Sequence, residues 1–314
     1  MMSETNMTKL RYFTVDVFTA DQFGGNQLAV VILESRDQIS SERMQQIAKE
    51  FNFSITSFIS PSSDDTNYTA SLRIFTTGIE LPFSGYPNIG SAYVISKLDS
   101  LFGRKVNLIN NNVVFEGKAG AVVCEIGSSD GVMIKTPKKY EQTEMNQLKS
   151  IIAECLGISQ TTIIGNPVSG GCGLSFLLVE VDSEKTLAQC VTSHTALKKY
   201  ENELKTKLGI GIHAFCKVDS KDGFDYKARN FFQDLDMISK GVVIEDPATG
   251  SANCALIGYL GLSNKISCDS IKKISQGDCV GRPSSLNGAY LNDGSVKIGG
   301  EVVGVMEGFL TLKQ

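Results

Sequence analysis

Two short segments of this 314-residue chain share a spacing that can bind an anion. Both read E-x-P-x-[ST]-G, at 80–85 and at 245–250, and each runs into an apolar stretch that predicts a helix, 89–98 and 252–262. A helix that begins on a small hydroxyl residue and a glycine presents unpaired backbone N–H groups at the positive end of its dipole, which suits a carboxylate. We therefore expect substrate-binding residues at the two helix starts: Ser84, Gly85, Thr249, Gly250 and Ser251.

Two such termini in corresponding positions would bind a small anionic molecule from both sides. A side chain from each half would then act on opposite faces of one carbon atom. Each motif alone is also compatible with a plain N-cap, and Asp246 before a proline is compatible with a turn residue. The pairs Arg73–Glu80 and Arg229–Glu245 are expected to hold the loops rather than to take part in catalysis.

The elements around the two motifs repeat in the same order. An R-x-F tripeptide precedes each motif, and a glycine-rich segment before an apolar strand occurs near 24–33 and again near 170–181. Coincidence between short motifs is the alternative, but the flanking elements match in order as well. We expect an α/β (α+β) fold of two domains, 9–137 and 138–314, with the last strands packed on either domain, and a duplication as its origin.

The charge, hydropathy and residue counts of the chain argue against nucleic-acid binding, membrane spanning and metal binding. The net charge is −4 with no long basic run, which argues against a nucleic-acid partner. No apolar stretch reaches the ~20 residues that span a bilayer, and the first residues lack a signal-peptide pattern. Eight cysteines contain no C-x-x-C pair, and only two histidines are present, so we expect reduced thiols, a cytoplasmic location and no metal site.

The chain resembles the phenazine-biosynthesis isomerase (PhzF-like) family over nearly its whole length, from Tyr12 to about Leu312. Several blocks carry the resemblance: Val15-Asp16-Val17-Phe18-Thr19, Phe23-Gly24-Gly25-Asn26, Gln45 to Asn52, Arg73-x-Phe75-Thr76, Glu245-Asp246-Pro247-x-Thr249-Gly250-Ser251-Ala252, and Gln276-Gly277 with Gly281-Arg282-Pro283-Ser284.

This resemblance implies a fold similar to diaminopimelate epimerase, with two pseudo-symmetric domains, each a sheet wrapped around a central helix. It implies an active site between the domains, a homodimer and no metal or organic cofactor. The best-known member of the family moves a proton within a dihydro-hydroxyanthranilate and so isomerises its ring. A glutamate of an N-x-S-E-T segment acts as acid/base there, with the aspartate of E-D-P-x-T-G and a histidine of F-C-G-H nearby.

The sequence departs from the family at these chemical positions. The glutamate position is Ile55, the histidine position is Tyr86, Asn253 stands where a histidine often ends G-S-A-H, and Gln27 replaces a proline. Proton transfer requires a group that can hold a proton near the working pH, and isoleucine has none. Asp246 remains.

Three functions are compatible with this pattern. The first is an isomerase or epimerase with altered chemistry, acting by cofactor-independent proton transfer on a small carboxylate-bearing metabolite. Asp246 is then its principal acid/base, Tyr86 a hydrogen-bond donor or second acid, and Asn26 a further substrate-binding residue. The second is a catalytically silent homologue that binds a small carboxylate. The third is a structural or interaction protein that keeps only the fold. The identity of the substrate cannot be read from the residues.

Overall fold

The computed structural model describes residues 7–127, 131–145, 147–200, 211–219, 221–232 and 244–313. The chain divides into two compact units. Unit 1 contains the residues up to Ile134 together with those from Gly299 onward, and unit 2 runs from Lys135 to Ile298.

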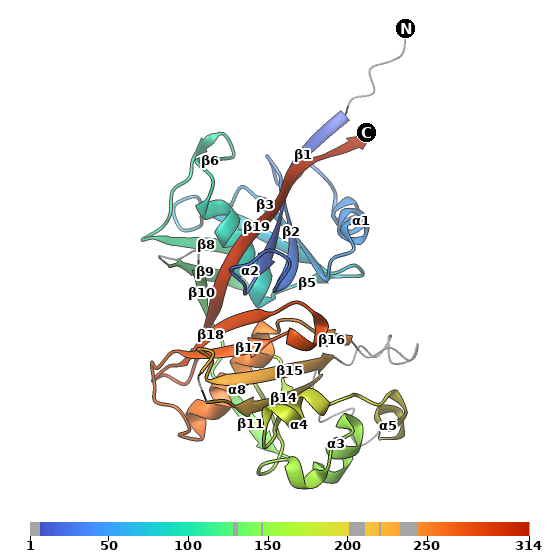
Figure 1. Ribbon diagram of the computed structural model, residues 1–314. Coiled ribbons are helices and arrows are strands. Elements are labelled where there is room, and N and C mark those ends of the chain that lie inside the picture. The colour runs from blue at the N-terminus through green and yellow to red at the C-terminus, as the bar shows by residue number, and fades with distance from the viewer. Residues whose placement is uncertain are drawn as a thin grey trace. The chain divides into compact units, whose positions relative to one another are not determined.

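Unit 1 is a closed barrel of eight strands. The strands are β1 (Met7–Val17), β2 (Asn26–Ile32), β3 (Ile55–Ser60), β4 (Ala70–Phe75), β8 (Asn112–Gly117), β9 (Gly120–Ile126), β10 (Gly131–Lys135) and the part of β19 (Val296–Lys313) that belongs to this unit. Each strand pairs with the next in that order, and β19 returns to pair antiparallel with β1 (Figure 1). The closure leaves no free edge among these strands.

The axis of this barrel is helix α2 (Gly85–Ser96). Its residues are apolar or small on every side, and eight of the twelve are buried, as a helix enclosed by a sheet requires. Gly90 shows how closely the strands approach, because a Cβ there would lie 2.6 Å from Leu28 Cδ2 and 2.8 Å from Val17 Cγ2. Helix α1 (Ser41–Phe51) packs Met44 and Ile47 against Phe58 and Phe75 in a second cluster.

Three short strands complete unit 1. Strand β5 (Glu80–Leu81) pairs with the end of β4 just before α2 begins. Strands β6 (Ser100–Leu101) and β7 (Arg104–Lys105) form a separate two-stranded hairpin after α2.

Unit 2 also wraps strands around a helix, α8 (Gly250–Leu262), of which ten residues are buried. Its strands are β11 (Glu141–Glu144), β12 (Val168–Gly171), β13 (Phe176–Glu180), β14 (Gly211–Lys217), β15 (Tyr226–Phe232), β16 (Ile244–Asp246), β17 (Lys272–Gln276) and β18 (Ser284–Tyr290). Unit 2 contains three further helices, α3 (Lys149–Leu156), α4 (Glu184–Gln189) and α5 (His194–Lys199). It also contains two short 3₁₀ turns, η1 (Gln160–Thr162) and η2 (Asp278–Val280). A core that includes Ile152, Leu156, Leu177 and Ile212 joins α3 to the strands.

The two units pair their strands in the same sequence. In unit 1 the pairs β1–β2, β2–β3, β3–β4, β4–β8 and β8–β9 are antiparallel, parallel, antiparallel, parallel and antiparallel. In unit 2 the pairs β12–β13, β13–β14, β14–β15, β15–β17 and β17–β18 repeat this pattern. The predicted architecture of two pseudo-symmetric domains, each a sheet around a central helix, is confirmed.

Candidate active site

The R-x-F and E-x-P motifs form the same structure in both units. Phe75 lies opposite Glu80 in the β4–β5 ladder, and Phe231 lies opposite Glu245 in the β15–β16 ladder. The guanidinium of Arg73 donates two hydrogen bonds to the Glu80 carboxylate, at 2.8 and 2.9 Å, and stacks over the Phe75 ring. In unit 2 the Arg229 guanidinium makes the corresponding pair with Glu245, at 2.8 and 2.7 Å, and stacks over Phe231.

These four charged side chains therefore fix the short strand that leads into each central helix. The hydrogen bonds from Arg73 hold the pKa of Glu80 below its usual range, and those to Glu245 raise the pKa of Arg229. Arg229 also donates to the backbone carbonyls of Leu187, Ala188 and Cys190, which ties α4 to the motif. This is the structural role expected of the two pairs.

A network of hydrogen-bonded polar side chains lies at the start of α8. Thr249, the N-cap residue, is buried, and its hydroxyl donates to the Asp246 carboxylate at 2.5 Å. The Gln276 amide nitrogen donates to this hydroxyl at 3.0 Å and to the Asp246 carbonyl at 2.7 Å. The Gln276 carbonyl oxygen accepts from the Thr249 backbone N–H at 3.2 Å and from Asn253 Nδ2 at 2.8 Å. The Thr249 hydroxyl thus donates to the Asp246 side chain and is itself oriented by the Gln276 amide.

The late Q-G and G-R-P-S motifs support this loop from the end of β17. Gly277 has φ +89°, and a Cβ there would lie 2.2 Å from the Arg282 carbonyl oxygen and 2.6 Å from that of Pro247. The Ser284 hydroxyl contacts the same two carbonyl oxygens, at 3.0 and 2.9 Å. Only glycine fits at 277, so the motif holds the E-D-P-x-T-G loop in place.

The start of α2 in unit 1 has the same backbone arrangement. Its N-cap residue is Ser84, and Asn88 Nδ2 donates to the Ser84 carbonyl at 2.7 Å. In α8, Asn253 Nδ2 donates to the Thr249 carbonyl at 3.0 Å in the same relation. Tyr86 is the second residue of α2 and is half-buried.

Both central helices lack the side-chain cap that α1, α4 and α5 have, and α3 lacks it as well. The N-cap serines of α1, α4 and α5 each accept a hydrogen bond from the backbone of the first turn. Neither Ser84 nor Thr249 does so, and neither helix has an acidic residue in its first turn. The first turn of each central helix therefore has no capping bond from its N-cap side chain and no acidic residue of its own. At Gly85 a Cβ would meet only Ile134 Cδ1, at 3.5 Å, so packing alone does not demand glycine there.

Asn26 and Ile55 open two neighbouring strands of unit 1. Asn26 is the first residue of β2 and Ile55 the first of β3, and Ile55 lies beside Leu28 in the parallel ladder between them. Both side chains are buried. The side chain at position 55 is therefore part of the apolar core and supplies no proton-carrying group.

The structure thus brings Asp246 and Thr249 into direct contact, with Gly250 and Ser251 in the first turn of α8. Ser84, Gly85 and Tyr86 stand at the start of α2, and Asn26 and Ile55 stand at strand starts in the same unit. Sequence reasoning missed the role of Gln276, which it recognised only as part of a motif. The signal that could have found it is a polar amide at the end of a short strand and directly before a glycine.

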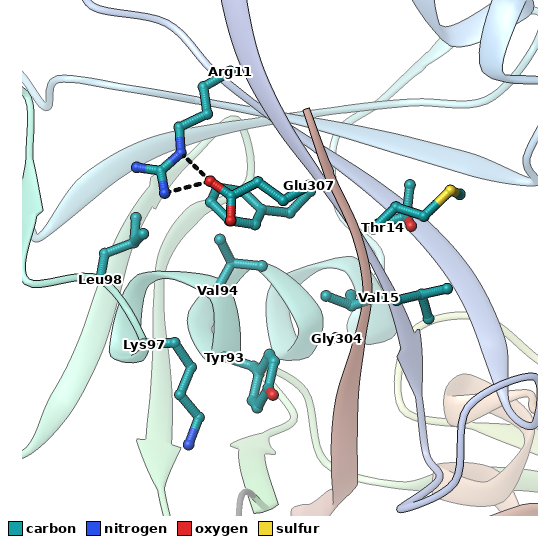
Figure 2. Close-up of a pocket in the computed structure, with 12 residues that line it drawn as sticks. Arg11, Thr14, Val15, Tyr93, Val94, Lys97, Leu98, Gly304 and Glu307 are labelled. Atoms are coloured by element: carbon teal, nitrogen blue, oxygen red, sulfur yellow. Dashed lines mark hydrogen bonds and ion pairs between the residues drawn. The ribbon is translucent and has the colours of Figure 1, made fainter. Parts of the chain in front are cut away.

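A surface pocket of about 370 Å³ lies elsewhere in unit 1 (Figure 2). It lies at the C-terminal end of α2, where Tyr93 and Lys97 stand near the ion pair between Arg11 and Glu307. None of the predicted site residues lines it. Within the described ranges, no group of three or more His, Cys, Asp or Glu side chains is arranged to hold a metal ion. Among the helices that the structure describes, none is long and apolar enough to cross a membrane.

Comparison with known proteins places these features in a family. Residues 15–308 match the PhzC-PhzF family model, described as phenazine biosynthesis-like protein. An uncharacterized isomerase of Mesorhizobium japonicum is 28% identical, over 97% of this chain and 99% of its own length. The trans-2,3-dihydro-3-hydroxyanthranilate isomerase of Pseudomonas aeruginosa is 27% identical, over 95% of this chain and 98% of its own.

Solved structures agree on the fold. A Bacillus anthracis phenazine biosynthesis protein of the PhzF family superposes with a TM-score of 0.81 at 19% identity, over 97% of this chain and all of that chain. A hydroxyproline epimerase of Agrobacterium vitis, with bound trans-4-hydroxy-L-proline, superposes with a TM-score of 0.59 at 12% identity, over 100% of this chain and 95% of that chain. The diaminopimelate epimerase-like fold is therefore confirmed.

Proposed function

The chain belongs to the phenazine biosynthesis-like (PhzC-PhzF) family, and we propose that it is an isomerase that moves a proton within a small carboxylate-bearing metabolite without a cofactor. The observation that carries this proposal is the fixed carboxylate of Asp246, which accepts a hydrogen bond from the Thr249 hydroxyl at 2.5 Å beside the start of α8. A positioned carboxylate of this kind can take a proton from carbon and return it at another atom.

In this proposal the start of α8 binds the substrate through Thr249, Gly250 and Ser251. The missing side-chain cap and the absence of an acidic residue in the first turn support an anionic ligand. The matching start of α2, with Ser84, Gly85 and Tyr86, is proposed as a second substrate-binding element, to which Asn26 belongs. Tyr86 would donate a hydrogen bond to the substrate or act as the second acid.

The proton balance of the step is simple. Asp246 as a carboxylate removes a proton from a carbon activated by the substrate's unsaturation or carboxylate, and the electron pair left on that carbon shifts along the conjugated system. Asp246 exchanges the proton that it has taken with solvent, and a solvent-derived proton is then delivered to a second carbon. Asp246 delivers it, or Tyr86 does so and is reprotonated by water while Asp246 releases its own proton to water. No net oxidation occurs, so no redox partner is needed.

One observation favours a second function. Ile55 stands at the position where the family resemblance implies a glutamate, and it is buried in the core. Since a positioned acid/base contributes typically ~10²–10⁴-fold to a rate, its loss favours a silent homologue that binds a small carboxylate. The two functions differ in one measurable respect, proton exchange with solvent.

Solvent exchange is therefore the test. Amino acids and cyclic carboxylic acids, including trans-2,3-dihydro-3-hydroxyanthranilate, are incubated in D₂O with the wild type and with Asp246→Asn, and deuterium on carbon is measured by mass spectrometry. The proposal expects incorporation by the wild type that falls at least ~10²-fold in the variant. Saturable ligand binding without exchange across the panel would instead establish the silent homologue. A fold that no panel member stabilises against heat would leave only a structural or interaction role.

We also propose that the two units arose by duplication. The repeated pattern of strand pairing supports this, as do the matching registers Phe75↔Glu80 and Phe231↔Glu245. The asparagine in the first turn and a half of each central helix, Asn88 and Asn253, adds a third correspondence.

A further inference from the structure

A cluster of buried polar side chains lies behind Asp246 in unit 2. His213 on β14, Asn230 on β15 and Asn253 on α8 are all fully buried. His213 lies directly opposite Asn230 in the β14–β15 ladder, and Asn230 lies directly opposite Asp246 in the β15–β16 ladder. Directly opposed residues project from the same face of a sheet, so the three side chains lie in one row.

Five polar atoms in this cluster lack a direct hydrogen bond of standard geometry: both imidazole nitrogens of His213, both amide atoms of Asn230, and Oδ1 of Asn253. The imidazole nevertheless adjoins the amides of Asn230 and Asn253. A buried polar atom left unsatisfied is costly, and such atoms are nearly always paired, directly or through an internal water. The cluster therefore requires a hydrogen-bonding scheme.

The known contacts fix the direction of that scheme. Asn253 Nδ2 already donates to the Thr249 carbonyl at 3.0 Å and to Gln276 Oε1 at 2.8 Å. Gln276 Nε2 already donates to the Asp246 carbonyl and to the Thr249 hydroxyl. Both amides are thus oriented, and what remains of Asn253 is the oxygen Oδ1, which can only accept.

His213 must then donate to Asn253 Oδ1 through one ring nitrogen. A neutral imidazole has one donor and one acceptor, so its other nitrogen accepts, and Asn230 Nδ2 is the donor beside it. This arrangement satisfies four of the five atoms, by small side-chain adjustments or through one water molecule.

We propose that neutral His213 is a positioning residue in a hydrogen-bond chain that runs in one direction and ends on the Asp246 carboxylate. The order of donation is Asn230, His213, Asn253, Gln276, Thr249 and Asp246. The effect of this hydrogen-bond chain on catalysis rests on the proposed acid/base function of Asp246. The existence of the hydrogen-bond chain does not depend on that function.

The surroundings of His213 support a neutral ring. Burial lowers the pKa of its imidazole to about 4, so it carries no charge near neutral pH. Arg229 and Glu245, which precede Asn230 and Asp246 in the sequence, are paired with each other, and alternation along the strands directs them to the opposite face. Hydrogen bonds in a chain polarise one another, and a donor at the end of the chain favours the charged form of the carboxylate.

The first test is the state of the imidazole. The sequence has only two histidines, so ¹⁵N-histidine labelling gives two pairs of ring-nitrogen signals, and His213→Gln assigns them. The proposal expects one fixed neutral tautomer at His213 from pH 5 to pH 8. A ring that becomes protonated within this range, or that averages between tautomers, would overturn it.

The second test follows the Asp246 carboxyl by ¹³C NMR, with its signal assigned by loss in Asp246→Asn. In His213→Phe the hydrogen-bond chain is cut, and Asp246 should take up its proton at a higher pH than in the wild type, because its remaining donor is no longer polarised by the groups before it. His213→Gln keeps one donor and one acceptor and should restore the wild-type midpoint, which a merely structural role does not predict. Asn230→Leu cuts the chain at a second point and serves if His213→Phe does not fold.

The matched control is Ser57→Ala in unit 1, because Ser57 lies opposite Ile74 as His213 lies opposite Asn230. The control should leave the Asp246 titration unchanged. An unchanged midpoint in a folded chain-cutting variant would contradict the proposal. Neither test uses a substrate, so failure of the proton-exchange assay and failure of the hydrogen-bond chain are separate results.

Discussion

At the scale of single residues, positions 55 and 246 differ in whether their side chains can hold a proton. Ile55 is buried at the start of β3, so its side chain belongs to the core and carries no titratable group. Asp246 retains both its place and a hydroxyl partner. The division of labour between these two positions can be tested by substitution.

Ile55→Glu should restore exchange if the position still lies beside the substrate. We expect deuterium incorporation to rise at least ~10-fold over the wild type, because a second acid/base becomes available. Ile55→Gln introduces a side chain of the same size as glutamate but without a titratable group, and it should give no increase in deuterium incorporation. Equal rates in the two variants would show that position 55 no longer takes part.

Thr249 offers a stability prediction with its own control in the other unit. Thr249→Val removes the donor to Asp246 and the acceptor for Gln276, so it should lower the free energy of unfolding by about 1–3 kcal/mol in urea titrations. Thr249→Ser keeps both contacts. Ser84→Ala changes the corresponding N-cap, whose side chain makes no capping bond, and should cost less than Thr249→Val. Equal costs would contradict the assigned network.

At the scale of elements, the loop that presents Asp246 depends on the turn after β17. Gly277 and Gly281 both have positive φ, +89° and +71°. A Cβ at Gly277 would collide with two backbone carbonyl oxygens, whereas a Cβ at Gly281 would have no heavy atom within 4 Å. Gly281→Ala should therefore cost only the backbone strain, about 1–2 kcal/mol, and Gly277→Ala clearly more. If urea titrations gave similar losses of unfolding free energy for the two variants, the close contacts of Gly277 would not hold the loop in place.

The ion pair before α2 gives a pH prediction. The pKa of Glu80 is lowered in the folded chain, mainly by hydrogen bonds from Arg73, so its contribution to stability is present above the usual value of 4.5. That contribution is lost as the pH falls through the lowered pKa. The difference in unfolding free energy between wild type and Glu80→Gln should therefore be present at pH 7 and shrink below about pH 4.5. A difference that grows on acidification would reverse the assignment.

Sequence reasoning identified the elements that local patterns determine. The two E-x-P-x-[ST]-G motifs and their helices follow from residues close together in the chain, and so do the Arg–Glu pairs. Gln276 and His213 could not be assigned, because parallel pairing of β15 with β17 and of β13 with β14 brings them beside the α8 loop from distant positions. Such pairings are set by the whole sheet rather than by any local spacing.

At the scale of the whole molecule, the fold was predictable from repeated motifs and family resemblance together. The central helices are apolar on all sides, and that property explains why each is enclosed by strands. The substrate was not predictable, since the proposed binding residues come from separate loops and strand starts. Assembly also stays a prediction: a homodimer should give twice the chain mass of 33.9 kDa by light scattering, and a value near 33.9 kDa would exclude it.

The central claim, that the fixed carboxylate of Asp246 moves a proton on a small carboxylate, is tested most directly by solvent deuterium exchange. Wild-type protein in D₂O should label at least one acid of the panel at carbon, and Asp246→Asn should lower that rate ~10²-fold or more while still binding the acid. Labelling at the same rate by both proteins, or by neither despite saturable binding, would contradict the account.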